Sequence, residues 1–327
     1  MKALVAGFST QLTKALEIGK NASLNKNLDP IRNIVIAGLG GSGIGGSIVS
    51  ELVAMDANVP MTVCKGYFIP AFVDKHTLFI ASSYSGNTEE TLQALEQAIT
   101  KKAKIVCITS GGKMTEIAKQ HKFDYITVPG GFPPRACLGY SLTQLFYILK
   151  FFGIINIDFE GDLNASISLL DKEEQGIIEL AQKIATKLEN KLPVIYATTY
   201  HEGIAVRFRQ QLNENAKTLC WHQVIPEMNH NELVGWREKN EDIAVILFRD
   251  QDEYERNNAR IEINKEVIKK YTSNILEIYS KGKSKIEKAL YLIHLGDWIS
   301  CYLAEKLGYD ANEINVINDL KAVLAKT

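Results

Sequence analysis

The sequence lacks long hydrophobic runs and an excess of either charge. No stretch reaches the roughly 18 apolar residues of a membrane span, and the N-terminal segment shows no small-residue cleavage site typical of secretion. The 37 Lys and Arg residues nearly balance the 38 Asp and Glu residues, so no basic surface predicts nucleic-acid binding. With 46% hydrophobic and 23% charged residues, the composition indicates a soluble globular protein. We expect neither a membrane nor a nucleic acid as partner.

Cysteine and histidine patterns for metals are also missing. The five cysteines are spread along the chain without a CxxC pair, and no HExxH occurs. A disulfide framework and a zinc site are therefore not predicted. We expect reduced thiols in a cytoplasmic protein without a bound metal.

Strand and helix patterns alternate along the 327 residues. Such alternation predicts parallel sheets with helices on both faces. A loosened pattern before a long helix, expected from about residue 165, marks a boundary between two domains of similar layout, residues 1–152 and 153–327. The predicted strands are residues 32–39, 61–66, 77–82, 104–109 and 124–128, then 192–199, 217–222, 242–248 and 274–280.

A turn rich in hydroxyl groups, SSYSGNTEETL, connects a predicted strand to a predicted helix. Ser83, Ser85 and Thr88 are placed where the backbone N–H groups and the dipole of the helix favour an anion. Ser, Asn and Thr are also the usual capping residues. The turn by itself therefore allows a phosphate site or an ordinary cap.

The glycine-rich segment GLGGSG, residues 38–43, follows a strand and precedes a helix, as in a dinucleotide-binding GxGxxG loop. The second strand ends in Cys64, Lys65 and Gly66, without the acidic residue that holds the ribose of NAD, although a lysine is compatible with NADP. Close packing of the glycines is another alternative. We favour a sugar-phosphate pocket that Gly41 and Ser42 share with the serine-rich turn.

Further candidate residues carry chemistry of their own. Glu214 lies near the end of a predicted helix, where most glutamates are solvated. His230 lies among carboxylates. Such a histidine can transfer protons, bind a metal or simply lie on the surface. Arg135 follows two prolines that stiffen its loop, and Lys321 lies on an otherwise apolar terminal helix. The residues alone leave these alternatives open.

Six motifs in order resemble one enzyme family, the bifunctional phosphoglucose/phosphomannose isomerases of the sugar isomerase (SIS) superfamily. The resemblance extends from about Arg32 to the end of the chain. It implies two tandem SIS domains of flavodoxin-like α/β type, each a parallel sheet flanked by helices. It also implies a homodimer without metal or cofactor. The motifs are GLGGSGIGGS, SSYSGNTEET, GGFPPRACLGYS, NENAK, PEMNHNELVGW and INDLKAVL.

The resemblance also implies a role for each candidate residue in a site shared between two subunits. The substrate phosphate is held by the glycine-rich and serine-rich loops, through Gly41, Ser42, Ser83, Ser85 and Thr88. The catalytic residues are Glu214 as base, Arg135 beside the enediolate, His230 of the second subunit for ring opening, and Lys321 at the sugar.

Enzymes of this family interconvert the aldose and ketose forms of hexose 6-phosphates through a cis-enediol. One base moves the proton between C2 and C1, and an arginine that stays charged can stabilise the developing negative charge. Family members often carry a threonine before the terminal lysine, but residues 310–321 contain none, and Asn312 is a candidate for its place. We therefore expect activity on glucose 6-phosphate first and on mannose 6-phosphate second. The alternatives are a sugar-phosphate-binding SIS regulator and an amidosugar-phosphate isomerase.

Overall fold

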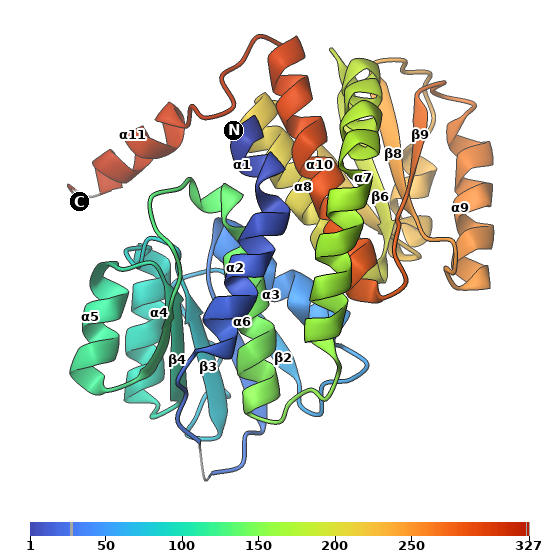
Figure 1. Ribbon diagram of the computed structural model, residues 1–327. Helices are drawn as coiled ribbons and strands as arrows, with labels where there is room; N and C mark the ends of the chain where they lie inside the picture. The colour runs from blue at the N-terminus through green and yellow to red at the C-terminus, as the bar shows by residue number, and fades with distance from the viewer. Residues whose placement is uncertain (27–28, 325, 327) are drawn as a thin grey trace. The chain divides into compact units, whose positions relative to one another are not determined.

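The computed structural model describes residues 1–26, 29–324 and 326, and contains two parallel β-sheets flanked by helices (Figure 1). The predicted α/β class is therefore confirmed. Two compact units are present: the first comprises Ala6–Lys172 and Gly282–Leu290, and the second Met1–Val5, Glu173–Lys281 and Tyr291–Thr327. The division of the fold into SIS domains at residues 152 and 153 stays a prediction.

The sheet of the first unit has the strand order β2-β1-β3-β4-β5, and every pair of neighbours is parallel. This is the flavodoxin-like order that the resemblance implied. All five strands lie within the predicted residues. They are β1 Asn33–Ala37, β2 Met61–Cys64, β3 Thr77–Ser82, β4 Lys104–Thr109 and β5 Asp124–Thr127.

Helices cover both faces of this sheet because residues on both sides of the central strands are apolar. On one face, Val35 and Phe79 pack with Leu95 of α4 and Met114 of α5. On the other face α3 lies so close that a Cβ added at Gly46 would meet the Ile36 side chain at 2.9 Å. Figure 1 shows these layers. The helices of this unit are α2 Phe8–Lys20, α3 Gly40–Leu52, α4 Glu89–Thr100, α5 Gly112–His121, η1 Pro134–Ala136 and α6 Leu138–Phe151.

The sheet of the second unit repeats the same order with four strands, β7-β6-β8-β9, again all parallel. This supports the prediction of two similar halves. The strands are β6 Leu192–Thr198, β7 Trp221–Ile225, β8 Ile243–Arg249 and β9 Ile275–Tyr279, with the helices η2 Thr199–His201, α8 Glu202–Ala216, η3 Glu227–His230, η4 Glu232–Gly235, α9 Glu255–Ile268 and α11 Asn315–Leu324. The short helix α1, Lys2–Ala6, begins the chain, and α7, Phe159–Leu188, and α10, Lys285–Lys306, each contribute residues to both units.

The two faces of the second sheet pack against different elements. The Phe208 ring of α8 lies 5.9 Å from the Phe248 ring of β8, which places α8 on one face. Met228 of η3 belongs to the core on the opposite face, together with Val194 and Tyr196 of β6. Because side chains alternate along a strand, the Phe248 side and the Tyr196 side of this sheet are distinct.

Two predicted boundaries were wrong. Helix α7 begins at Phe159 rather than near residue 165, because the Asp158 carboxylate accepts a hydrogen bond from the Gly161 N–H at 3.1 Å and caps the first turn. Strand β7 begins at Trp221 rather than at residue 217. Residues before it remain attached to the end of α8, where Asn213 Nδ2 donates to the Thr218 carbonyl at 2.7 Å.

Four of the five cysteines are buried, Cys220 is half-buried, and all are free thiols, as predicted. Within residues 1–26, 29–324 and 326, no helix is long and apolar enough to cross a membrane. The same residues contain no group of three His, Cys, Asp or Glu side chains arranged to hold a metal ion.

Candidate active site

The serine-rich and glycine-rich loops meet at one edge of the first sheet. Helix α3 follows β1 and helix α4 follows β3, and these two strands are neighbours in the sheet. Their helices start at the C-terminal edge, where the strand order reverses and α/β proteins commonly bind ligands. Two helix N-termini at this edge favour an anion through their N–H groups and dipoles.

The serine-rich loop is organised by its own hydroxyl groups. Ser83 is 1% exposed, and its Oγ lies 2.8 Å from Oγ1 of Thr88, the N-cap of α4. The Ser83 Oγ also accepts a hydrogen bond from the Gly86 N–H at 3.1 Å. Ser85 is exposed, and its Oγ accepts from the Asn87 N–H at 3.2 Å. The sequence thus places three hydroxyl groups around the start of α4.

Gly86 permits this turn. Its φ of +68° lies in the left-handed region, and a Cβ at this position would come within 1.8 Å of the Gly111 carbonyl oxygen. A side chain here would displace the Gly111 backbone as well as strain the turn.

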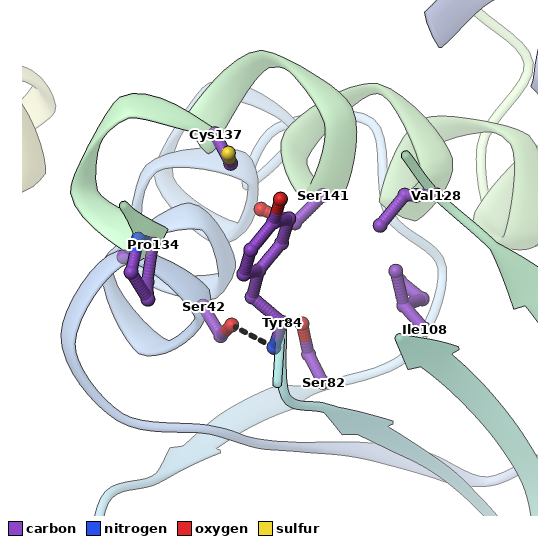
Figure 2. A pocket seen from close by; sticks show the side chains of 9 residues that line it. Ser42, Ser82, Tyr84, Ile108, Val128, Pro134, Cys137 and Ser141 are labelled. Carbon is purple, nitrogen blue, oxygen red and sulfur yellow. Dashed lines mark hydrogen bonds between the residues drawn. The ribbon is translucent and has the colours of Figure 1, made fainter. Parts of the chain in front are cut away.

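The glycine-rich loop packs directly against the serine-rich loop. The Ser42 Oγ accepts a hydrogen bond from the Tyr84 N–H at 3.3 Å (Figure 2). A Cβ at Gly38 would lie 2.7 Å from the Ser82 carbonyl, and one at Gly41 would lie 2.9 Å from the Pro134 carbonyl. The glycines of this loop therefore do pack closely against neighbouring backbone, which was one of the alternatives for the loop. This packing brings Ser42 to the serine-rich loop.

Tyr84 was missed by the sequence analysis, although it lies between the two serines. Its hydroxyl donates to the Pro129 carbonyl at 2.9 Å and accepts from the Phe132 N–H at 3.2 Å. Figure 2 shows its ring between Ser42 and Ser82 on one side and Cys137 and Ser141 on the other. Burial, with the Cys137 contact as a smaller cause, raises the pKa of Tyr84 above the ordinary tyrosine value. The residue links the serine-rich loop to the loop that carries Arg135.

A small cavity lies beneath these loops. Its lining includes Gly41, Ser42, Tyr84, Pro134 and Cys137, and its volume is about 10 Å³. This is about the space of one water molecule, so a hexose phosphate does not fit inside it. The loops around the cavity are the candidate binding surface.

Arg135 lies on η1, at the end of the loop that Tyr84 holds. The residue is only 3% exposed. A buried guanidinium needs polar or anionic partners, and Arg135 does make interactions within the protein. Its backbone also packs at Gly41, where an added Cβ would lie 3.7 Å from the Arg135 Cα.

The second unit holds the other candidate residues on separate elements. Glu214 is half-buried in the last turn of α8, near the chain's entry into β7. His230 is exposed at the end of η3, after β7 has ended. Because α8 and η3 pack on opposite faces of the sheet, these elements do not bring Glu214 and His230 to one face.

A chain of hydrogen bonds anchors the segment that follows His230. The Glu232 carboxylate accepts from the Tyr196 hydroxyl at 2.7 Å and from Trp221 Nε1 at 3.1 Å. The Tyr196 hydroxyl in turn accepts from Trp236 Nε1 at 3.1 Å. Burial, followed by the Glu232 hydrogen bond, raises the pKa of Tyr196 above its ordinary value, so the hydroxyl keeps the proton that it donates. Glu232 is one of the carboxylates near His230 in the sequence, and the sequence analysis assigned it no role of its own.

Comparison with known proteins decides the family. Residues 177–324 match the bacterial phospho-glucose isomerase C-terminal SIS domain, and residues 28–131 match the SIS domain. A bifunctional phosphoglucose/phosphomannose isomerase of Caldicellulosiruptor bescii is 40% identical over 97% of this chain and 96% of its own length. The chain belongs to the bifunctional phosphoglucose/phosphomannose isomerase family.

Two further relatives and one solved structure extend this comparison. The bifunctional phosphoglucose/phosphomannose isomerase of Aquifex aeolicus is 36% identical over 92% of the chain and 93% of its own length. A D-glucosamine-6-phosphate 4-epimerase of Sulfolobus acidocaldarius is 31% identical over 88% of both chains. The C-terminal domain of glucosamine-fructose-6-phosphate aminotransferase from Francisella tularensis shares the fold, with a TM-score of 0.76 at 14% identity over 94% of this chain and 96% of its own.

The placement of Lys321 in the structure differs from that of the other candidate residues. Lys321 lies on α11, where none of the described residues is buried. Its segment is joined to the end of α8 through the turn at residues 310–313. Gly41, Ser42, Ser83, Ser85 and Thr88 are brought together by the first unit, whereas Glu214, His230 and Lys321 lie on three separate elements of the second.

Proposed function

We propose that this chain interconverts glucose 6-phosphate, and also mannose 6-phosphate, with fructose 6-phosphate as an aldose–ketose isomerase without a cofactor. The observation that carries this proposal is the meeting of two helix N-termini with the hydroxyl groups of Ser42, Ser83 and Thr88 at the reversal of strand order. This arrangement suits a phosphate dianion. Membership of the isomerase family supports the same substrate class.

In the proposed reaction, Glu214 removes the proton from C2 of the aldose, which leaves a cis-enediolate. Glu214 then returns this proton to C1 while the proton of the C2 hydroxyl passes to O1, and the ketose forms. One carboxylate serves for both directions because no proton is gained or lost overall. Arg135 would stabilise the negative charge that develops on the enediolate oxygen. Lys321 would contact the sugar from the terminal helix.

We further propose a homodimer in which His230 acts in the site of the other subunit, moving a proton between the ring oxygen and the C1 hydroxyl during ring opening. The opposite placement of α8 and η3 on the second sheet supports this arrangement. In the dimer, Glu214 of one subunit would meet His230 of the second subunit. The His230 of its own chain lies on the other face of the sheet. The free thiols support a cytoplasmic location for this dimer.

The function is tested with purified, EDTA-treated protein and fructose 6-phosphate, following glucose 6-phosphate and mannose 6-phosphate separately. Formation of both products is expected. Formation of glucose 6-phosphate alone would restrict the enzyme to one epimer. If the protein forms neither of the two products, the proposal is overturned. The Glu214→Gln protein should lose about 10³-fold in kcat, as expected for removal of a general base. Glu266→Gln, an exposed change on α9, controls for an unspecific effect of a Glu-to-Gln substitution.

A second candidate, an activity on an amino-sugar phosphate, is favoured by the resemblance to the Sulfolobus acidocaldarius epimerase. The phosphate loops would bind either substrate, since both end in the same group. Glucosamine 6-phosphate is therefore offered in a parallel reaction. Its turnover without turnover of fructose 6-phosphate would replace the first proposal by the second.

A further inference from the structure

The ammonium group of Lys217 lies among three backbone carbonyls of the second unit. Nζ donates to the carbonyl of Glu214 at 2.6 Å, to that of Asp310 at 3.0 Å and to that of Glu313 at 2.8 Å. A lysine ammonium has three N–H donors, so these carbonyls can take one each. A single side chain thus joins the helix that carries Glu214 to the turn between α10 and α11.

Local structure explains how Lys217 reaches both sides. The residue follows the last residue of α8 with a φ of +53°, a left-handed conformation that ends the helix. The carbonyls in the last turn of a helix have no partners within the helix, and they carry the negative end of its dipole. A cation at this point is favourable, and the left-handed turn leaves its side chain beside these carbonyls.

The turn that Lys217 contacts is itself compact. The Asp310 carboxylate accepts from the Asn312 N–H at 2.8 Å and from Asn312 Nδ2 at 3.0 Å. The Glu313 N–H donates to the Asp310 carbonyl at 3.3 Å. Fixing two carbonyls of this turn therefore fixes the point at which the chain enters α11.

Helix α11 has little burial of its own to hold it in place. None of its described residues is buried, and Val316, Leu320 and Val323 are each more than half exposed. An isolated ten-residue helix is marginal in water. Polar contacts at the entry turn thus weigh heavily in deciding where Lys321 can lie.

We propose that Lys217 is a positioning residue, which holds the turn at residues 310–313, and with it the approach of Lys321, at the end of the helix that carries Glu214. This inference rests on the proposed function, because Glu214 and Lys321 act on substrate only there. Lys217 itself bonds to backbone carbonyls and is assigned no contact with the sugar. Its loss should alter how the sugar is held while leaving the phosphate loops of the other unit unchanged.

The first test is hydrogen–deuterium exchange of peptides covering residues 310–324. In Lys217→Met, which removes the charge and all three donors, exchange there should be at least tenfold faster than in the wild-type protein. Lys217→Arg keeps a charged donor and should stay close to the wild type. Lys183→Met, an exposed change on α7, should have no effect. If Lys217→Met does not fold, Lys217→Gln replaces it.

The second test is the ratio of mannose 6-phosphate to glucose 6-phosphate in the initial products from fructose 6-phosphate. This ratio does not depend on how much of the enzyme is folded, so a loss of stability alone would not move it. We expect at least a threefold change in Lys217→Met, and none in Lys183→Met. An unchanged ratio with unchanged exchange would overturn the inference, as would faster exchange with an unaltered ratio.

The two proposals fail in different ways. A wild-type protein that forms neither product overturns the proposed function, and the positioning role of Lys217 with it. An active Lys217→Met protein with wild-type exchange and product ratio overturns the inference alone.

Discussion

Glu214 and His230 belong to elements that cover opposite faces of the second β-sheet, although their motifs are neighbours in the sequence. Helix α8, which ends just after Glu214, packs on the side of Phe248. The η3 turn, which ends at His230, packs on the side of Tyr196. A single copy of this sheet therefore separates the proposed base from the proposed ring-opening residue. This is the geometric argument for a site assembled from two subunits.

The Tyr84 hydroxyl should matter for activity through the two hydrogen bonds that it makes to the loop before Arg135. Tyr84→Phe removes the hydrogen bonds to Pro129 and Phe132, which together contribute about 1–3 kcal/mol to stability. We expect a lower melting temperature and a roughly tenfold lower kcat/KM, because the Arg135 loop is no longer tied to the serine-rich loop. Tyr125→Phe, on β5, is the matched control. Equal kcat/KM in the two variants would refute the link.

Gly41 should not tolerate a side chain. In Gly41→Ala the new Cβ would lie 2.9 Å from the Pro134 carbonyl oxygen, so the Arg135 loop must move. We expect kcat/KM for fructose 6-phosphate to fall at least tenfold, since small displacements of a positioning group cost that much. Gly66→Ala meets nothing within 4 Å and serves as control. Wild-type kinetics in Gly41→Ala would show that close packing here has no role in the site.

His222 should make the protein less stable in mild acid. Burial, together with the Arg209 charge, lowers the pKa of His222 below its ordinary value of 6.5, although Glu202 opposes this. The unfolded chain therefore binds the proton more readily, and the free energy of unfolding falls as the pH drops through this range. The melting temperature should fall less between pH 7.5 and pH 5.5 in His222→Gln than in the wild type. A steeper fall in the variant would contradict this sign.

The sequence predicted the fold well because its signals were local and periodic. Apolar runs such as TLFIAS became fully buried strands of parallel sheets, and hydroxyl groups around Thr88 marked the start of a helix. The predicted start of β7 was wrong because Asn213 and Thr218 extend the end of α8 by a side-chain hydrogen bond. A propensity pattern does not contain such a contact.

The site was predicted less completely than the fold. Ser42 and Ser83 could be named from a motif, since each lies beside a turn that a glycine makes possible. Tyr84 and Lys217 could not, because their partners lie at residues 129–132 and 310–313, far away in the sequence. Which loop a tyrosine or lysine contacts depends on the tertiary fold.

The most direct test of a shared isomerase site mixes two inactive proteins, Glu214→Gln and His230→Ala. The two are co-expressed with different tags, and the heterodimer is purified and assayed with fructose 6-phosphate. In a shared site, the intact Glu214 of one subunit meets the intact His230 of the other, so one of the two sites works. We predict about half of the wild-type activity for the heterodimer, as dimer symmetry requires, against nearly none for either parent. A heterodimer as inactive as its parents would contradict the account.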